Sequence, residues 1–95
     1  MPQRRVTVAS QVGLHARPAA LFVRAAGRAG MGVTIAKEGS TPIDARSLLA
    51  VMALDVRHGD EVILAAEGSG ADAALDGLVT LLATDLDAPA ADVDA

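Results

Sequence analysis

Apolar residues in this chain switch repeatedly between a period of two and a period near 3.6, and this alternation restricts the possible folds strongly. Val6 and Val8, with Thr7 between them, are typical of a strand that buries one face. Apolar residues three and four apart, as in the segment 71–83, are typical of a helix with one buried stripe. Because such strands and helices must cover each other, we expect an α+β domain of two layers. The expected strands are 4–9, 32–37, 41–44 and 61–66, and the expected helices are 16–28, 47–53 and 71–83.

The core is expected to be aliphatic, because the chain of 95 residues is 52% hydrophobic and has one aromatic residue, Phe22. In the first helix, Leu21, Phe22 and Ala25 are expected to form the inner stripe. The length suits a single domain. After Leu86 the composition changes to Ala, Asp and Pro, which predicts a domain at 1–86 and a flexible acidic tail at 87–95.

Charge and composition argue against several classes of protein. The net charge of −4 argues against a nucleic-acid partner, since such binding needs a basic face. The absence of cysteine excludes disulfides and thiolate metal sites. No segment approaches the roughly 20 apolar residues of a membrane span, and no signal-peptide pattern follows the N-terminus. A cytoplasmic protein with no metal and no organic cofactor is therefore expected.

Residues 13–20, GLHARPAA, place His15 immediately before an expected helix. Pro18 marks the first turn, because the N–H that proline lacks would have no intrahelical partner there. The unpaired N–H groups and the positive end of the helix dipole make such a position favourable for an anion. His15 has a nucleophilic ring nitrogen and is expected to accept a phosphoryl group there. The backbone N–H groups of Ala16 and Arg17, together with the Arg17 guanidinium, are expected to bind that group.

These residues resemble the active-site motif of the HPr family, the histidine-containing phosphocarriers of the bacterial sugar phosphotransferase system. The segment 47–54, SLLAVMAL, resembles the second helix of that family, and the likeness extends from about residue 4 to residue 82. It implies an open-faced sandwich with a four-stranded antiparallel sheet in the order 1-4-2-3 and three helices on one face. It also implies that His15 is phosphorylated at Nδ1 by Enzyme I, which phosphoenolpyruvate charges. The carrier then passes the group to the EIIA domain of a sugar permease, as a stoichiometric intermediate rather than an enzyme.

The resemblance further implies that Ser47 matches a serine that HPr kinase/phosphorylase modifies in some lineages. A docking face for the partners is expected on the first two helices, with arginines around an apolar centre, which suits acidic proteins. The arginines are Arg17, Arg24 and Arg28, which fall close to one line of the first helix, and the other expected contact residues are Ala20, Leu21, Leu48, Leu49 and Met52.

Alternative interpretations stay open at several positions. His15 by itself is also consistent with a structural helix cap, and Ser47 needs no role beyond capping. His58 lies in an expected turn at 57–60 with no second metal ligand nearby, which indicates a surface turn residue. Two other functions remain: a paralogue that serves a nitrogen-related relay or acts as a regulator, and a binding module with an anion site but no phosphoryl turnover. A monomer is expected.

Overall fold

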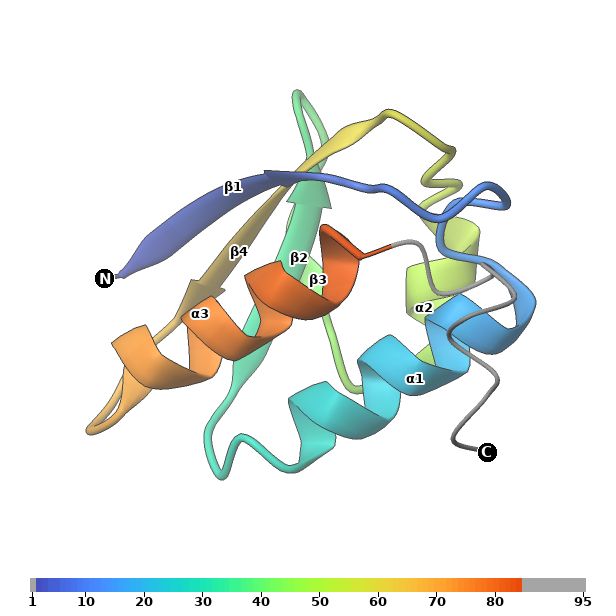
Figure 1. The fold of residues 1–95 in the computed structure, drawn as a ribbon. Coiled ribbons are helices and arrows are strands. Elements are labelled where there is room, and N and C mark those ends of the chain that lie inside the picture. The colour runs from blue at the N-terminus through green and yellow to red at the C-terminus, as the bar shows by residue number, and fades with distance from the viewer. Residues whose placement is uncertain (1, 85–95) are drawn as a thin grey trace.

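A computed structural model of the chain describes residues 2–84, and the tail expected at 87–95 lies outside these residues. The elements follow one another in the predicted order, β-α-β-β-α-β-α (Figure 1). They are β1 (Gln3–Thr7), α1 (Ala16–Gly27), β2 (Val33–Lys37), β3 (Ile43–Asp44), α2 (Leu48–Ala53), β4 (Glu61–Ala66) and α3 (Ala71–Leu82). The helix boundaries agree with the predicted ones to within one residue.

The four strands form one antiparallel sheet in the order β1-β4-β2-β3, which confirms the predicted topology. In the register, Val6 of β1 pairs with Val62 of β4, and Leu64 of β4 pairs with Ile35 of β2. These side chains share one face, because partners opposite each other in a ladder point the same way. All of them are buried, and the helices cover this face while the other face of the sheet stays open (Figure 1).

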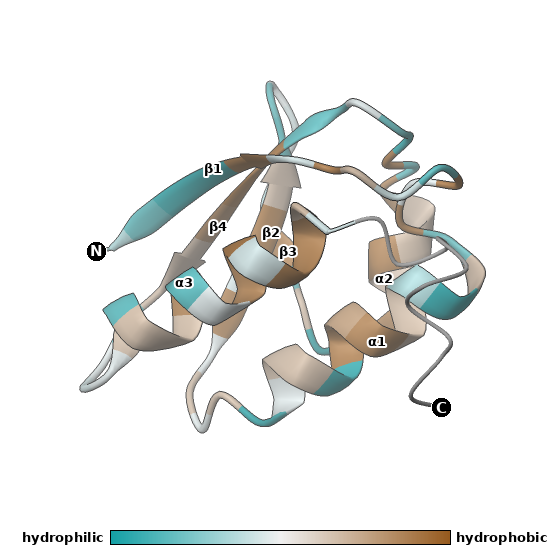
Figure 2. Cartoon of the chain, in the orientation of Figure 1, coloured by the Kyte–Doolittle hydropathy of each residue, from teal (hydrophilic) through white to brown (hydrophobic). Residues whose placement is uncertain are grey.

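The core is aliphatic around Phe22, and hydropathy colouring shows apolar segments on the central strands and on α1 and α3 (Figure 2). The expected inner stripe of α1 is only partly correct. Phe22 is fully buried, but Leu21 and Ala25 are half-buried, and Ala19 and Ala26 take the inner positions instead. Successive helical residues differ by about 100° around the axis, so a one-residue error rotates the predicted stripe by that angle. The direction from which α1 packs onto the sheet decides which stripe faces inward.

Three of the strands are shorter than predicted, and β2 lacks only the expected Gly32. β1 ends at Thr7 because the next two residues leave the ladder: Val8 N–H donates to Asp60 O at 2.9 Å and Ala9 N–H to Leu82 O at 3.0 Å. The edge strand β3 keeps only Ile43 and Asp44, with the exposed Pro42 just before it, at an edge as expected for a residue without an N–H to donate. The chain from Val8 onward thus turns toward the helices, where the candidate site lies.

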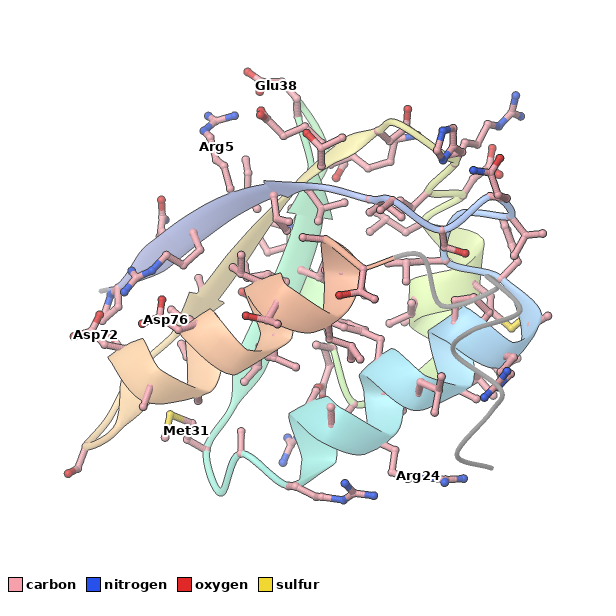
Figure 3. All side chains as sticks on the ribbon, viewed as in Figure 1. Arg5, Arg24, Met31, Glu38, Asp72 and Asp76 are labelled. Carbon is pink, nitrogen blue, oxygen red and sulfur yellow. The ribbon has the colours of Figure 1, made fainter. Side chains whose placement is uncertain are left out.

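Arginines on β1 link its two faces to neighbouring elements (Figure 3). Arg4 lies on the helix side and binds Asp72 at 2.9 Å and Asp76 at 3.0 Å, both on α3. Arg5 points to the open side and binds Glu38 and Glu61, each at 2.8 Å. Since these groups are largely exposed to solvent, the pairs fix orientation more than they stabilise the fold.

Candidate functional site

His15 is the N-cap residue of α1, at the position that the motif predicts. Its backbone is extended (φ −128°, ψ 162°), and its imidazole makes no capping hydrogen bond. The side chain is 37% exposed, so it is partly open to solvent. The imidazole therefore does not cap the helix through its side chain.

The first turn of α1 follows directly after His15, with its backbone N–H groups at the positive end of the helix dipole. Ala19 N–H is bonded to His15 O at 3.5 Å, and the N–H groups of Ala16 and Arg17 precede it in the turn. Ala16 has a left-handed φ of +50°, a conformation that costs an alanine about 1–3 kcal/mol. A half-exposed imidazole beside such a turn can hold and exchange an anionic group.

The loop before His15 is fixed by the segment that follows α2. Leu14 is fully buried, and its N–H donates to Val56 O at 3.0 Å. Gly13 has a φ of +67° and lies so close to this segment that an added Cβ would be 2.1 Å from Val56 O. Glycine is therefore required here both for its backbone conformation and for the close approach. The sequence predicts that Gly13 lies in a loop, but only the structure shows that Gly13 packs against Val56.

Asp55 is the residue of the site that sequence reasoning missed. It follows Leu54, the C-cap residue of α2, and its Oδ1 lies 3.6 Å from Nε2 of His15. Its backbone is left-handed (φ +57°), a region that aspartate tolerates better than most residues. A lone aspartate forty residues from the histidine carries no recognisable motif. The left-handed turn that marks this position is visible only in the structure.

Two cations flank this aspartate. Arg57 donates to Asp55 Oδ2 at 3.1 Å, and Lys37 Nζ donates to Asp55 O at 3.1 Å. The hydrogen bond from Arg57 and its charge, followed by the charges of Lys37 and His15, hold the pKa of the Asp55 carboxyl below its usual value. Asp55 is therefore a carboxylate at neutral pH, next to the ring that the motif singles out.

The turn at 57–60 lies where it was predicted and is tied to the loop before α1. His58 is exposed, as expected of a surface turn residue, but its Nδ1 lies 3.1 Å from Ser10 O. Gly59 N–H donates to Val8 O at 2.9 Å, and Arg57 N–H donates to Asp60 Oδ2 at 2.9 Å. The last bond is the main reason that the pKa of Asp60 is lowered. These contacts hold the Asp55 side of the site against the His15 side.

Ser47 is the N-cap residue of α2, and its hydroxyl accepts a hydrogen bond from Ala50 N–H at 3.2 Å. The predicted capping role is thus confirmed, and the side chain is half-buried. Ser47 stands at the start of α2 and Asp55 just after its end, so the six residues of the helix, about 9 Å long, lie between the two positions.

The residues expected in a docking face lie on two helices that contact each other, α1 and α2. The patch on α2 is solvent-exposed, since Leu49 is 83%, Leu48 41% and Met52 37% exposed. The expected arginines on α1 and Arg28 at its C-cap are exposed, and Arg24 extends outward from the helix (Figure 3). The remaining residues, Ala20 and Leu21, are half-buried. Val12, in the loop before His15, is 48% exposed and was not predicted.

No helix within residues 2–84 combines the length and the hydrophobicity needed to cross a lipid bilayer.

Comparison with known proteins gives one consistent match. Residues 2–84 match the family model PTS-HPr, described as the PTS HPr component phosphorylation site. The chain is 49% identical over 87 residues to the phosphocarrier protein HPr of Streptomyces coelicolor, which covers 92% of this chain and 94% of that protein.

Solved structures agree with this match. The crystal structure of HPr from Bacillus anthracis has a TM-score of 0.80 and 38% identity, covering 85% of this chain and 95% of that one. The catabolite repression protein Crh of Bacillus subtilis, crystallised as a domain-swapped dimer, has a TM-score of 0.69 and 38% identity. That match covers 90% of this chain and 97% of Crh.

Proposed function

This chain belongs to the HPr family of phosphocarrier proteins, and we propose that His15 receives a phosphoryl group from phosphorylated Enzyme I and passes it to the EIIA component of a sugar permease. The observation that carries the proposal is the half-exposed imidazole of His15 at the N-cap of α1, where it makes no capping bond. Such a group is free to react while the helix start next to it favours an anion.

In this proposal the first turn of α1 stabilises the transferred group. The phosphoryl group carries close to two negative charges. The N–H groups of Ala16 and Arg17 lie at the positive end of the helix dipole, and the exposed Arg17 guanidinium adds charge-assisted hydrogen bonds. An open site of this kind holds the group weakly enough to release it. The protein then acts as a stoichiometric carrier and not as an enzyme.

The partners would dock on the face formed by α1 and α2. The exposed patch of Leu48, Leu49 and Met52 would provide its apolar centre, and the exposed Arg24 and Arg28 would provide a charged border. Interfaces of this type bury an apolar middle and use charge to attract and orient the partner. The location would be cytoplasmic and the carrier a monomer, although Crh shows that a protein of this fold can also form a swapped dimer.

Phosphorylation by purified Enzyme I tests the proposal. The protein is incubated with phosphoenolpyruvate and Enzyme I, and mass spectrometry is run under alkaline conditions that preserve phosphohistidine. We expect one phosphoryl group on His15 of the native protein and none on His15→Ala, followed by transfer to an EIIA domain. An unmodified native protein would contradict the carrier function and favour an anion-binding module without turnover.

A second candidate is a relative that acts chiefly in regulation or in a nitrogen-related relay. The similarity to Crh, a catabolite repression protein, favours this candidate, and so does the position of Ser47 at the start of α2. A phosphate on Ser47, added by an HPr kinase/phosphorylase, would place negative charge beside the patch on α2. Parallel assays with sugar-type Enzyme I, nitrogen-type Enzyme I and the kinase distinguish the candidates by which of them modifies the protein.

A further inference from the structure

We propose that Asp55 is a positioning residue for His15: its carboxylate keeps the ring proton on Nε2 and so leaves the lone pair of Nδ1 available to phosphorus. This inference rests on the proposed function of His15 as the acceptor. It assigns a role to a side chain that lies outside the motif and comes from the other end of the site.

The two carboxylate oxygens of Asp55 contact different side chains. Oδ2 accepts a hydrogen bond from Arg57 at 3.1 Å, which fixes the plane of the carboxylate. Oδ1 faces Nε2 of His15 at 3.6 Å. The left-handed backbone of Asp55 and the bond from Lys37 Nζ to its carbonyl hold the residue in this place. Oδ1 is thus directed at the ring by contacts that do not involve the ring.

A neutral imidazole carries its proton on one nitrogen and a lone pair on the other, and the hydrogen bond made by one nitrogen decides which. A carboxylate beside Nε2 favours a proton on Nε2, as it does for histidines that bind metals. The distance of 3.6 Å is longer than the usual 2.7–3.2 Å of a hydrogen bond. Contacts of this kind commonly tighten when the reacting complex forms.

The transfer step then balances without moving a proton. The lone pair of Nδ1 forms a bond to phosphorus, and the bond between phosphorus and the donor breaks, with its electron pair returning to the donor. The His15 ring, with a proton on Nε2 and the phosphoryl group on Nδ1, becomes cationic, and the Asp55 carboxylate partly neutralises it. In onward transfer a lone pair of the acceptor protein's nucleophilic atom forms a bond to phosphorus. The N–P bond breaks, its electron pair returns to Nδ1, and the neutral ring leaves with its proton still on Nε2.

Two substitutions remove the charge while keeping the backbone conformation. Asp55→Asn preserves the shape of the side chain, and asparagine tolerates a left-handed φ. Asp55→Gly removes the side chain and is unstrained at a positive φ. Glu67→Gln is the matched control, because it also removes one negative charge but follows the far end of β4, whereas Asp55 precedes the start of that strand.

The first measurement is the tautomer ratio of the unphosphorylated ring, from the ¹⁵N chemical shifts of labelled His15 at a pH where the ring is neutral. Partly exposed charge pairs have small effects, so both Asp55 variants should lower the ratio of the Nε2–H form to the Nδ1–H form about two- to fivefold. Glu67→Gln should leave it unchanged. The rate of phosphorylation by Enzyme I should also fall in both Asp55 variants and stay unchanged in Glu67→Gln.

An unchanged tautomer ratio in Asp55→Asn and Asp55→Gly would overturn the role of Asp55, whatever the phosphorylation assay shows. If the ratio shifts but phosphorylation by Enzyme I proceeds at the native rate, the positioning role is overturned as well. The failure of the carrier function has a different signature. In that case the native protein stays unlabelled by Enzyme I, although the ¹⁵N experiment, which needs no partner, still reports the effect of Asp55 on the ring.

Discussion

Replacement of Gly13 by alanine should damage the site more than its small size suggests. The left-handed φ of +67° costs an alanine about 1–2 kcal/mol by itself. The new Cβ would also lie 2.1 Å from Val56 O, so the two segments must move apart. That movement breaks the 3.0 Å hydrogen bond from the buried Leu14 N–H to Val56 O, a loss of about 1–3 kcal/mol. Together we expect Gly13→Ala to lower the free energy of unfolding by about 2–5 kcal/mol.

A loss of this size is a large part of the roughly 5–15 kcal/mol that a domain of this size has. At about 4–8 °C per kcal/mol, the melting temperature should fall by at least about 8 °C. Urea unfolding followed by far-ultraviolet circular dichroism measures the change in the free energy of unfolding. Circular dichroism is used because the chain has no Trp or Tyr for fluorescence. Gly39→Ala is the control, because Gly39 has a φ of +82° but nothing within 4 Å of an added Cβ. Equal destabilisation by the two variants would refute the argument from close approach.

Four further predictions concern capping, packing, acid stability and docking. Ser47→Ala should lower the free energy of unfolding by about 1 kcal/mol and Ser47→Asp by less, in urea unfolding; equal losses would contradict the capping bond. Phe22→Ala should cost about 3–5 kcal/mol in the same assay, and the half-buried Leu21→Ala clearly less, whereas the reverse order would contradict the observed inner stripe. The folded-state pKa of Asp60 lies below its ordinary 3.8 because a backbone N–H donates to it, so its stabilisation is complete above about pH 5 and disappears as the pH falls through the folded value. The melting temperature of Asp60→Asn should therefore depend less on pH, between about pH 7 and 2.5, than that of the native protein. The same pH profile in both proteins would show that Asp60 does not contribute to acid stability. Arg24→Glu should slow association with Enzyme I and weaken its salt dependence, measured by stopped flow at several salt concentrations; an unchanged rate would exclude Arg24 from the docking face.

Local patterns in the sequence were sufficient for most of the fold. The alternation around Val6 and the helical spacing around Leu75 each lie within a dozen residues, and both elements occur where predicted. The topology 1-4-2-3 came from the resemblance to HPr proteins, and the observed register confirms it. The position of His15 at the start of α1 also followed from a local signal, the proline three residues later.

The errors and omissions concern contacts between distant segments. The prediction of the inner stripe of α1 was wrong by one residue at Leu21. The docking angle of a helix depends on every surface that it meets, and the local pattern does not contain those surfaces. The requirement for glycine at position 13 comes from its close approach to Val56, and the carboxylate beside His15 comes from Asp55. Each partner is about forty residues away in the chain. No periodic pattern records such a pair.

The sequence by itself therefore determined the order of the elements, the aliphatic core and the position of a histidine at a helix start, since each of these arises from interactions between near neighbours in the chain. The tertiary structure alone decided that the end of α2 brings a carboxylate to Nε2 of that histidine. It did so because a left-handed turn at Asp55 and the close contact between Gly13 and Val56 bring two remote loops together, and such packing depends on the whole fold.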